Sequence, residues 1–246
     1  MSMKNIEIPF IRNMFENIAP RYDLLNRLLS LRQDVYWRRK MVSAIKTPDS
    51  GVLLDVACGT GDVALEIIQQ KGSGNNVFGI DFSTGMLTLA RDKIDTKNAS
   101  ANIHLLAGNA FNLPFRGKTF DAITIAFGIR NINDKLSVMK EFHAGLKTDG
   151  MLLVLELATP DRGLFLSIYR FYSKTILPFV GRLFSKNSMA YQYLPSSVAN
   201  FPDPDNFAAT MRLAGFQDVA WEKLTFGIAV LYVGHKKRSR RSRLEP

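Results

Sequence analysis

The central part of the chain alternates between short apolar runs and amphipathic segments. The buried strands of a parallel sheet are apolar throughout, whereas the crossover helices between them are apolar on one face only. Alternation of this kind is typical of a parallel sheet with helices on both faces. The apolar runs are Val52–Ala57, Val77–Phe82, Ile103–Ala107, Ala122–Phe127 and Met151–Leu157, and the segments with helical spacing are 62–70, 84–94 and 134–147.

The segments on either side of this region follow other patterns. The apolar positions of residues 10–46 have helical spacing, so we expect two helices that are broken near Pro20. Later in the chain a helix starts at Asp203–Asp205, and two apolar runs, Asp218–Leu224 and Ile228–Gly234, predict an antiparallel hairpin after it. The helically spaced positions near the N-terminus are Phe15, Ile18, Tyr22, Leu25, Leu28, Leu29 and Val35.

The segment before that helix interrupts the alternation. Gly163–Phe184 is rich in Leu, Ile, Phe and Tyr, but its charged residues and Pro178 make it too interrupted to span a bilayer. It is also too apolar to lie bare in water. Two interpretations stay open: packing on the domain, or an interfacial helix or lid that contacts lipid.

Together these patterns predict a doubly wound α/β fold with a mostly parallel, seven-stranded sheet. We expect a single domain over residues 1–235 and a disordered basic tail over 236–246. The expected parts of the domain are an N-terminal helical cap (10–46), a core (50–157), an insertion or lid (158–200), and a C-terminal helix and hairpin (201–235).

Composition excludes several classes of protein. The chain has 246 residues, of which 46% are hydrophobic and 22% charged, so wholesale disorder is excluded. Cys58 is the only cysteine, which rules out an intrachain disulfide, and the three histidines lack metal-ligand spacing. We expect no metal. The N-terminus lacks the apolar core of a signal peptide, so we expect the protein in the reducing cytosol.

The net charge of +10 is unevenly distributed, because six cations stand in the C-terminal tail against one acid, Glu245. A basic tail attracts anionic lipid or nucleic acid. The tail has no aromatic residue on which a base could stack, so we expect no nucleic-acid partner. A peripheral contact with the inner face of the membrane stays open. The tail cations are Lys236, Lys237, Arg238, Arg240, Arg241 and Arg243.

A glycine-rich turn provides the strongest chemical signal. The stretch Leu53–Asp62 contains a strand, the turn Gly59-Thr60-Gly61 and the start of a helix, which allows a ligand to approach the backbone closely. The next strand ends at Asp81, whose carboxylate can accept hydrogen bonds from both ribose hydroxyls of an adenosine cofactor. Gly59 to Ala64 also satisfies G-x-G-x-x-A, so a nicotinamide dinucleotide is a second candidate.

Three observations argue against the dinucleotide. Asp55 lies four residues before the first glycine, where a methionine ammonium group would favour a carboxylate. About fifty largely helical residues precede the turn. The Tyr-x-x-x-Lys pair of Tyr36 and Lys40 also precedes it, whereas in short-chain dehydrogenases that pair follows the turn.

Further motifs give a more specific resemblance. Gly108-Asn109-Ala110 ends the third strand, as in class I S-adenosylmethionine-dependent methyltransferases. Other stretches resemble one family more closely, the ubiquinone/menaquinone biosynthesis C-methyltransferases, over about residues 12–235. Those stretches are Met14–Asn26, Phe127-Gly128-Ile129-Arg130-Asn131 and Tyr191-Gln192-Tyr193-Leu194.

The resemblance implies a cofactor, S-adenosyl-L-methionine, and a set of residues that hold it. Thr60 and Asp81 match the loop and ribose positions, and Asn109 with Ala110 matches the pair that borders the adenine. Asp55 and Gly59 rest on the general methyltransferase pattern. Ala126 stands where the family usually has a serine that contacts the cofactor, so we leave it out of the expected site.

The resemblance also implies a reaction, methyl transfer to a ring carbon of a polyprenylated hydroquinone. We expect Arg130 to favour the phenolate form of the ring, while Asn131 and Tyr22 hold a water molecule or the quinol oxygen. Guanidinium stays protonated, so the proton acceptor is left unassigned. A methyltransferase for another small acceptor is the alternative. The sequence leaves the choice of ring and the formation of a homodimer open.

Overall fold

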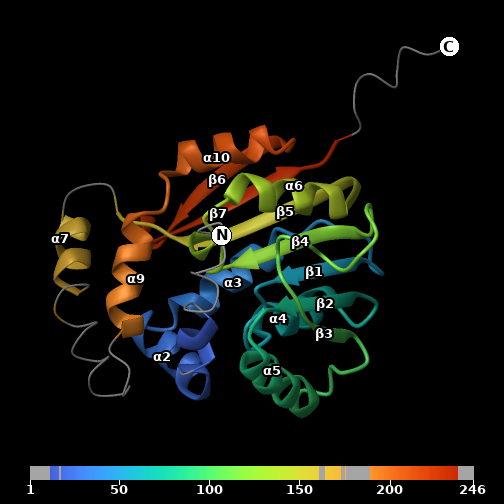
Figure 1. Ribbon diagram of the computed structural model, residues 1–246, viewed down its shortest axis with the longest axis horizontal. Helices are drawn as coiled ribbons and strands as arrows, with labels where there is room; N and C mark the ends of the chain where they lie inside the picture. The colour runs from blue at the N-terminus through green and yellow to red at the C-terminus, as the bar shows by residue number, and fades with distance from the viewer. Residues whose placement is uncertain (1–11, 17, 161–163, 173–174, 176–188, 238–246) are drawn as a thin grey trace, which may run out of the picture.

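One seven-stranded sheet forms the centre of the molecule (Figure 1), and the computed structural model describes residues 12–16, 18–160, 164–172, 175 and 189–237. The strand order is β3-β2-β1-β4-β5-β7-β6. The first five strands are parallel, and β7 is antiparallel to both β5 and β6. The strands are β1 (Val52–Val56), β2 (Asn76–Asp81), β3 (Ile103–Ala107), β4 (Phe120–Ala126), β5 (Leu146–Leu157), β6 (Gln217–Leu224) and β7 (Ala229–His235).

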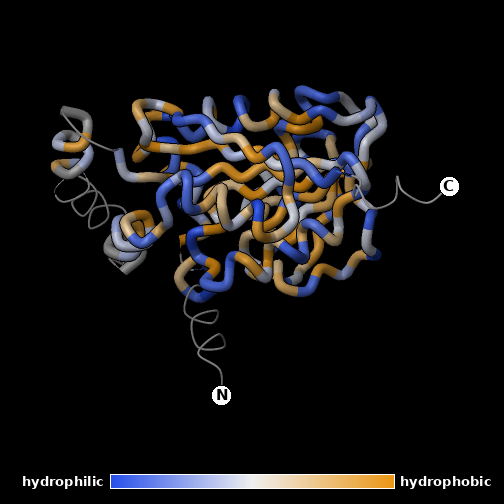
Figure 2. The backbone as a smooth tube through the Cα atoms, turned by 90° about the horizontal axis from the view of Figure 1, so that it is seen from above, coloured by the Kyte–Doolittle hydropathy of each residue, from blue (hydrophilic) through white to orange (hydrophobic). Residues whose placement is uncertain are grey.

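Helices cover both faces of the sheet, because successive strand residues point to opposite sides. In β1, Leu53 packs into a cluster with residues of α3, α4 and α5, whereas Leu54 packs into a second cluster with residues of α6 and α10. The hydrophobic strands run through the middle of the molecule in Figure 2. The helices are α3 (Gln33–Ser43), α4 (Asp62–Lys71), α5 (Thr84–Thr96), α6 (Lys135–Gly145) and α10 (Pro204–Leu213). The predicted doubly wound α/β fold is confirmed.

The N-terminal cap has one more break than the sequence predicts. A short 3-10 helix, η1 (Ala19–Arg21), contains Pro20 and leads into α2 (Tyr22–Leu29), so the break near this proline is confirmed. The chain breaks again at Leu31 and Arg32, which have φ angles of 50° and 64°. Left-handed backbone ends a helix, but neither residue is of a type that signals it.

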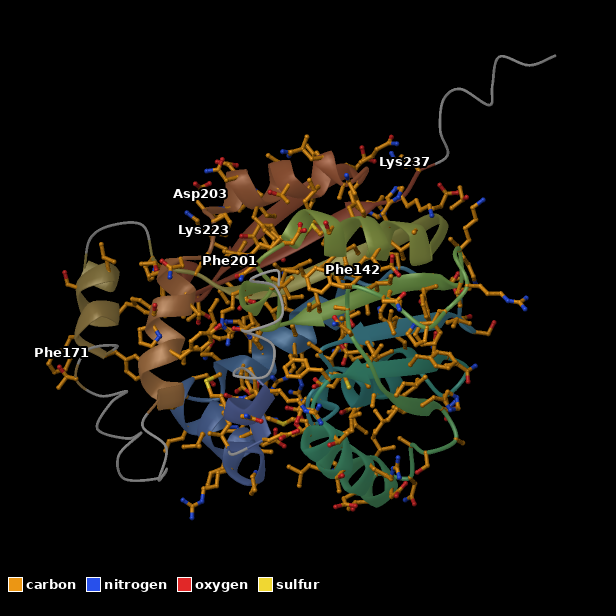
Figure 3. All side chains as sticks on the ribbon, viewed as in Figure 1. Phe142, Phe171, Phe201, Asp203, Lys223 and Lys237 are labelled. Atoms are coloured by element: carbon orange, nitrogen blue, oxygen red, sulfur yellow. The ribbon has the colours of Figure 1, made fainter. Side chains whose placement is uncertain are left out.

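Two helices of the predicted insertion lie beyond the carboxyl ends of the parallel strands. They are α7 (Leu164–Phe171) and α9 (Met189–Ala199), and in Figure 1 they stand with α2 at the same side of the molecule. Phe171 points outward from α7 (Figure 3). No helix in the described part of the chain has the length and apolarity that a bilayer span requires. Most of the remaining insertion lies outside the described residues.

The predicted tail begins too early by at least one residue. The backbone of Lys236 pairs with Asp149 and Gly150, and its ammonium group donates to the carbonyl oxygens of His143 and Leu146, each at 2.7 Å. These carbonyls lie at the end of α6, where a cation is favoured by the helix dipole. Lys236 therefore belongs to the folded domain. Residues 238–246 lie outside the described part.

Lys236→Met is expected to lower the free energy of unfolding by about 1 kcal/mol, because it removes charge-assisted hydrogen bonds that are partly exposed to water. Lys237→Met is the matched control, since Lys237 pairs with an exposed carboxylate, that of Asp218. Urea denaturation of both variants measures the difference. Equal midpoints for the two variants would contradict this assignment.

Candidate active site

A cavity opens at the carboxyl ends of β1, β2 and β4, where the sequence predicts the cofactor. Gly59, Asp81, Asn109 and Ala110 all line it, although they come from three separate loops. Asn131 lines it as well. The structure therefore brings together most of the predicted cofactor residues, with one predicted catalytic residue beside them.

The Asp81 carboxylate is held by backbone groups. One oxygen accepts from the amide of Gly59 at 2.9 Å and the other from the amide of Ser83 at 2.9 Å. Burial raises the pKa of Asp81, although these backbone hydrogen bonds oppose the effect. Each carboxylate oxygen has a second lone pair, so Asp81 can still accept from two hydroxyl groups of a ligand in the cavity.

Asp55 lies beneath this cavity and does not line it. Its side chain is almost fully buried, and one oxygen accepts from the Thr124 hydroxyl at 2.9 Å. The other oxygen is buried without a hydrogen-bond partner among the described residues. Burial raises the pKa of Asp55 to about 7, and the hydrogen bond from Thr124 opposes this only in part. An unpaired carboxylate in this position favours a nearby cation.

The Thr60 side chain contacts the cap and Lys93. It is buried, and its hydroxyl donates to Asp23 at 2.6 Å and accepts from Lys93 at 3.0 Å. Thr60 does not line the cavity. Its side chain instead joins the glycine turn to the first turn of α2.

An ion-pair network continues from this contact. Asp62, the first residue of α4, contacts Arg27 at 2.7 Å, Lys93 at 2.8 Å and Arg38 at 3.0 Å. Asp34 pairs with both arginines as well. Burial alone would raise the pKa of Asp62, but Arg38 and Lys93 lower it to about 2. Four helices, α2, α3, α4 and α5, meet in this network.

A second, apolar cavity adjoins the first. It lies between the cap, the insertion helices and the ends of β4 and β5, and six of its apolar lining residues are Ile18, Leu25, Leu29, Trp37, Tyr172 and Leu194. Phe15, Tyr22 and Phe127 line both cavities, so they form the wall between them. A ligand bound in the first cavity and a ligand bound in the second would approach each other at this wall.

Arg130 lines the second cavity, and its side chain is only 7% exposed. Its guanidinium pairs with the fully buried Glu156 at 2.7 Å and donates to the carbonyl of Phe127. Burial works against the charge, but Glu156, Tyr22 and Tyr193 together more than offset this and raise the pKa of Arg130. The arginine is therefore charged inside an apolar cavity.

Tyr22 and Asn131 lie close to this arginine. Burial raises the pKa of Tyr22, and a hydrogen bond to Asn26 and the charge of Arg130 oppose the effect. The Tyr193 hydroxyl donates to the side-chain oxygen of Asn131 at 3.0 Å. The three predicted catalytic residues are thus gathered where the two cavities meet.

The wall between the cavities has a strained backbone. Phe127 has a φ of 57°, in the left-handed region that an aromatic residue rarely adopts, and its amide donates to Leu155 at 2.8 Å. A Cβ atom on the next residue, Gly128, would come within 2.8 Å of the Ala57 side chain. Strain of this kind is found at sites where the surroundings fix the backbone.

The first cavity fits S-adenosylmethionine on three counts. Asp81 offers free acceptor positions for the ribose, and the unpaired Asp55 carboxylate favours the ammonium group nearby. Gly59 has a φ of +52°, and a Cβ atom there would have no heavy atom within 4 Å, so its absence leaves open space in the cavity lining. No group of three or more His, Cys, Asp or Glu side chains among the described residues could hold a metal ion.

Comparison with known proteins agrees with this geometry. The model of the ubiE/COQ5 methyltransferase family matches residues 2–236. This chain belongs to that family. A "Ubiquinone/menaquinone biosynthesis C-methyltransferase UbiE" of Geotalea uraniireducens is 46% identical over 226 residues, which cover 92% of this chain and 96% of the relative. A "Demethylmenaquinone methyltransferase" of Thermus thermophilus is 44% identical, and the match covers 91% of this chain and 100% of the relative.

Solved structures show the same fold in more distant proteins. A SAM-dependent methyltransferase of Thermotoga maritima matches 92% of this chain and 99% of its own, with a TM-score of 0.65 and 20% identity. The [4+2]-cyclase SpnF matches 93% of this chain and 96% of its own, with a TM-score of 0.69 and 15% identity. The resemblance and the fold class predicted from the sequence are therefore confirmed.

Two residues at the site were left out of the set predicted from the sequence. Ala126 lines the first cavity, although it lacks the expected hydroxyl. Glu156 holds Arg130, but it lies 26 positions away in the sequence. The end of a predicted parallel strand was the available signal for Glu156, because such ends meet at the ligand-binding edge of the sheet.

Asp55→Asn is expected to change how stability depends on pH. The raised pKa means that the folded state binds the proton more tightly than the unfolded chain, whose carboxyl has an ordinary value of 3.8. This stabilisation is present below that value and is lost as the pH rises through about 7. The asparagine variant has no such loss, so we expect it to be more stable than the wild type by roughly 3–4 kcal/mol at alkaline pH.

Urea denaturation from about pH 4 to about pH 8, without ligand, measures this difference. Asp92→Asn, at an exposed position of α5, is the matched control and should show no such trend. A constant stability difference between Asp55→Asn and the wild type across this range would refute the raised pKa.

Proposed function

We propose that this chain is an S-adenosylmethionine-dependent methyltransferase that methylates a ring carbon of a polyprenylated hydroquinone. One observation carries the proposal: a cavity lined by Asp81 and Asn109, which suits the cofactor, shares a wall with a second cavity that is lined by the buried Arg130. The names of the relatives, UbiE and demethylmenaquinone methyltransferase, support the same assignment. The proposed substrate is therefore a quinol of menaquinone or ubiquinone synthesis.

In this proposal the first cavity holds the cofactor through residues from three loops. Asp81 accepts from the ribose hydroxyls, and Asn109 with Ala110 borders the adenine. Gly59 leaves room for the ligand, while Asp55 attracts the ammonium group from below. When bound, S-adenosylmethionine supplies an electrophilic methyl group on a sulfonium ion. Thr60 acts through its contact with the cap.

The second cavity favours the reactive form of the acceptor ring. A charged arginine next to a phenol stabilises the phenolate, and the ring carbon beside a phenolate is nucleophilic. Arg130 takes this role, and Tyr22 with Asn131 orients the ring oxygen or a water molecule at the wall. The apolar lining excludes water, which strengthens these electrostatic interactions, and it suits a prenyl chain.

The cap (10–46) and the insertion (158–200) form the cover of this second cavity in our proposal. Leu25 and Leu29 of α2 and Tyr172 after α7 line it, and the Tyr172 hydroxyl donates to the carbonyl of Leu29 at 2.7 Å. The two segments thus meet above the same space. The remaining boundary, between the core (50–157) and the final helix and hairpin (201–235), divides parts of one sheet.

Incubation with methyl-labelled S-adenosylmethionine and each reduced, demethylated quinol tests the function. We expect label in the quinol ring with the wild type. Arg130→Lys should lower turnover about a hundredfold, the usual scale for the loss of one electrostatic stabiliser, while cofactor affinity stays unchanged. Asp81→Ala should instead weaken cofactor binding by roughly 2–4 kcal/mol, because hydrogen bonds to a charged group are lost.

Calorimetry measures cofactor affinity, so it separates the effect of Arg130→Lys on turnover from the effect of Asp81→Ala on cofactor binding. Label in another small acceptor but in no quinol would replace the proposed substrate and keep the methyltransferase chemistry. Tight binding of NADH without binding of S-adenosylmethionine would overturn the cofactor assignment. Normal turnover of Arg130→Lys would remove the role given to Arg130.

We further propose that the outer face of α2 rests on an anionic membrane, where a prenylated substrate is dissolved. Leu24 and Leu28 are exposed on α2 and Leu31 is exposed just after it, and Arg21 and Arg32 are exposed on either side of this segment. Apolar residues flanked by cations are typical of interfacial helices. The other side of α2 lines the second cavity, so this contact would bring the cavity close to the lipid.

Leu24→Ser combined with Leu28→Ser is expected to weaken binding to phosphatidylglycerol vesicles about tenfold, because two apolar side chains no longer enter the interface. Leu213→Ser is the control, since Leu213 is more exposed than Leu24 or Leu28 but lies on α10 at another part of the molecule (Figure 1). Co-sedimentation at low salt measures binding. Equal effects of both changes, or no binding by the wild type, would reject this surface.

A further inference from the structure

Glu156 is a buried carboxylate whose only charged hydrogen-bond partner among the described residues is Arg130. It lies at the end of β5 and is 0% exposed. One oxygen accepts from the Arg130 guanidinium at 2.7 Å and from the amide of Leu157 at 2.8 Å, and the other accepts from the Arg130 amide at 3.0 Å. Glu156 therefore holds both the side chain and the backbone of Arg130.

Glu156 itself lines neither cavity, whereas Arg130 lines the second one. Glu156 can therefore act on a ligand only by holding the arginine and through its own charge, not by direct contact. The guanidinium retains a buried nitrogen, Nε, that has no hydrogen-bond partner in the described part of the chain.

The pair also has an electrostatic consequence. A lone arginine would present a full positive charge to a phenol, but the Arg130–Glu156 pair has no net charge. The carboxylate behind the arginine repels a phenolate in front of it, while it fixes the direction in which the arginine donates. By orienting the arginine, Glu156 favours ionisation of the phenol, whereas the negative charge of Glu156 disfavours it.

We propose that Glu156 is a positioning residue, which orients Arg130 toward the ring oxygen of the acceptor and moderates the charge that this oxygen experiences. The inference rests on the proposed function, because it takes a phenolic acceptor as the ligand. Other titratable groups interact with this pair or with Tyr22 beside it. Those that interact with the pair are Tyr22 of α2, Lys135 of α6, Tyr193 of α9 and Tyr232 of β7. Those that interact with Tyr22 are Arg38 of α3 and Asp81 of β2.

A prenylated nitrophenol tests the proposal without turnover, because its absorbance reports ionisation in the cavity. With the wild type, we expect the midpoint of the absorbance titration to lie about one pH unit below that of the free probe. Glu156→Gln removes the charge and keeps the length of the side chain, so the midpoint should fall further. Glu156→Asp keeps the charge but withdraws it by one methylene, so the midpoint should rise toward that of the free probe.

Two further variants separate this role from a merely structural one. Arg130→Met should raise the midpoint, and adding Glu156→Gln should return it toward that of the free probe but not below it, because the repulsion is removed and no arginine remains to stabilise the phenolate. The double variant also removes both charges together, which avoids an unpaired buried charge and preserves the fold. Thermal unfolding of each variant confirms that it is folded.

The outcomes are distinguishable. An unchanged or higher midpoint in Glu156→Gln, or a midpoint of the double variant as far below that of the free probe as in Glu156→Gln alone, would overturn the role of Glu156. A wild-type midpoint equal to that of the free probe would remove the role of Arg130 and that of Glu156 with it. Label transfer to quinols decides the proposed function independently of this probe.

Discussion

The shared contacts of Asp62 hold the site together. Cations from α2, α3 and α5 converge on this one carboxylate at the start of α4, directly after the glycine turn. Three aspartates and three cations balance there, so charges that would be costly to bury are compensated. The network joins the cap to the turn, and the cap carries Tyr22 and much of the second cavity. The geometry of both cavities therefore depends on it.

The two cavities suit different ligands because different side chains line them. The first presents the Asp81 carboxylate and asparagine amides among apolar side chains, and the second presents Arg130, Arg38 and Asp34 among aromatic and aliphatic side chains. Methyl transfer from a cation to an anion loses charge in the transition state, so a dry space between the two reactants favours it. The rigid wall at Phe127 supplies alignment, which is worth more than any single contact.

The fold could be predicted from the sequence because the spacing of apolar residues along the chain is a local property. The alternation of apolar runs located the five parallel strands and the hairpin, and the glycine turn with Asp81 located the first cavity. Contacts between distant segments could not be found in this way. The roles of Thr60 and Glu156 depend on Asp23 and Arg130, which only the folded chain brings near. The break at Leu31 and Arg32 has no glycine or proline to mark it.

The wall shared by the two cavities has a kinetic consequence. Phe15 and Tyr22 belong to the cap, and each faces both cavities. A movement of the cap that admits a molecule to one cavity also displaces a boundary of the other. Loading and release of the two reactants are then steps of a single gating motion, so the residence time of one governs the exchange of the other.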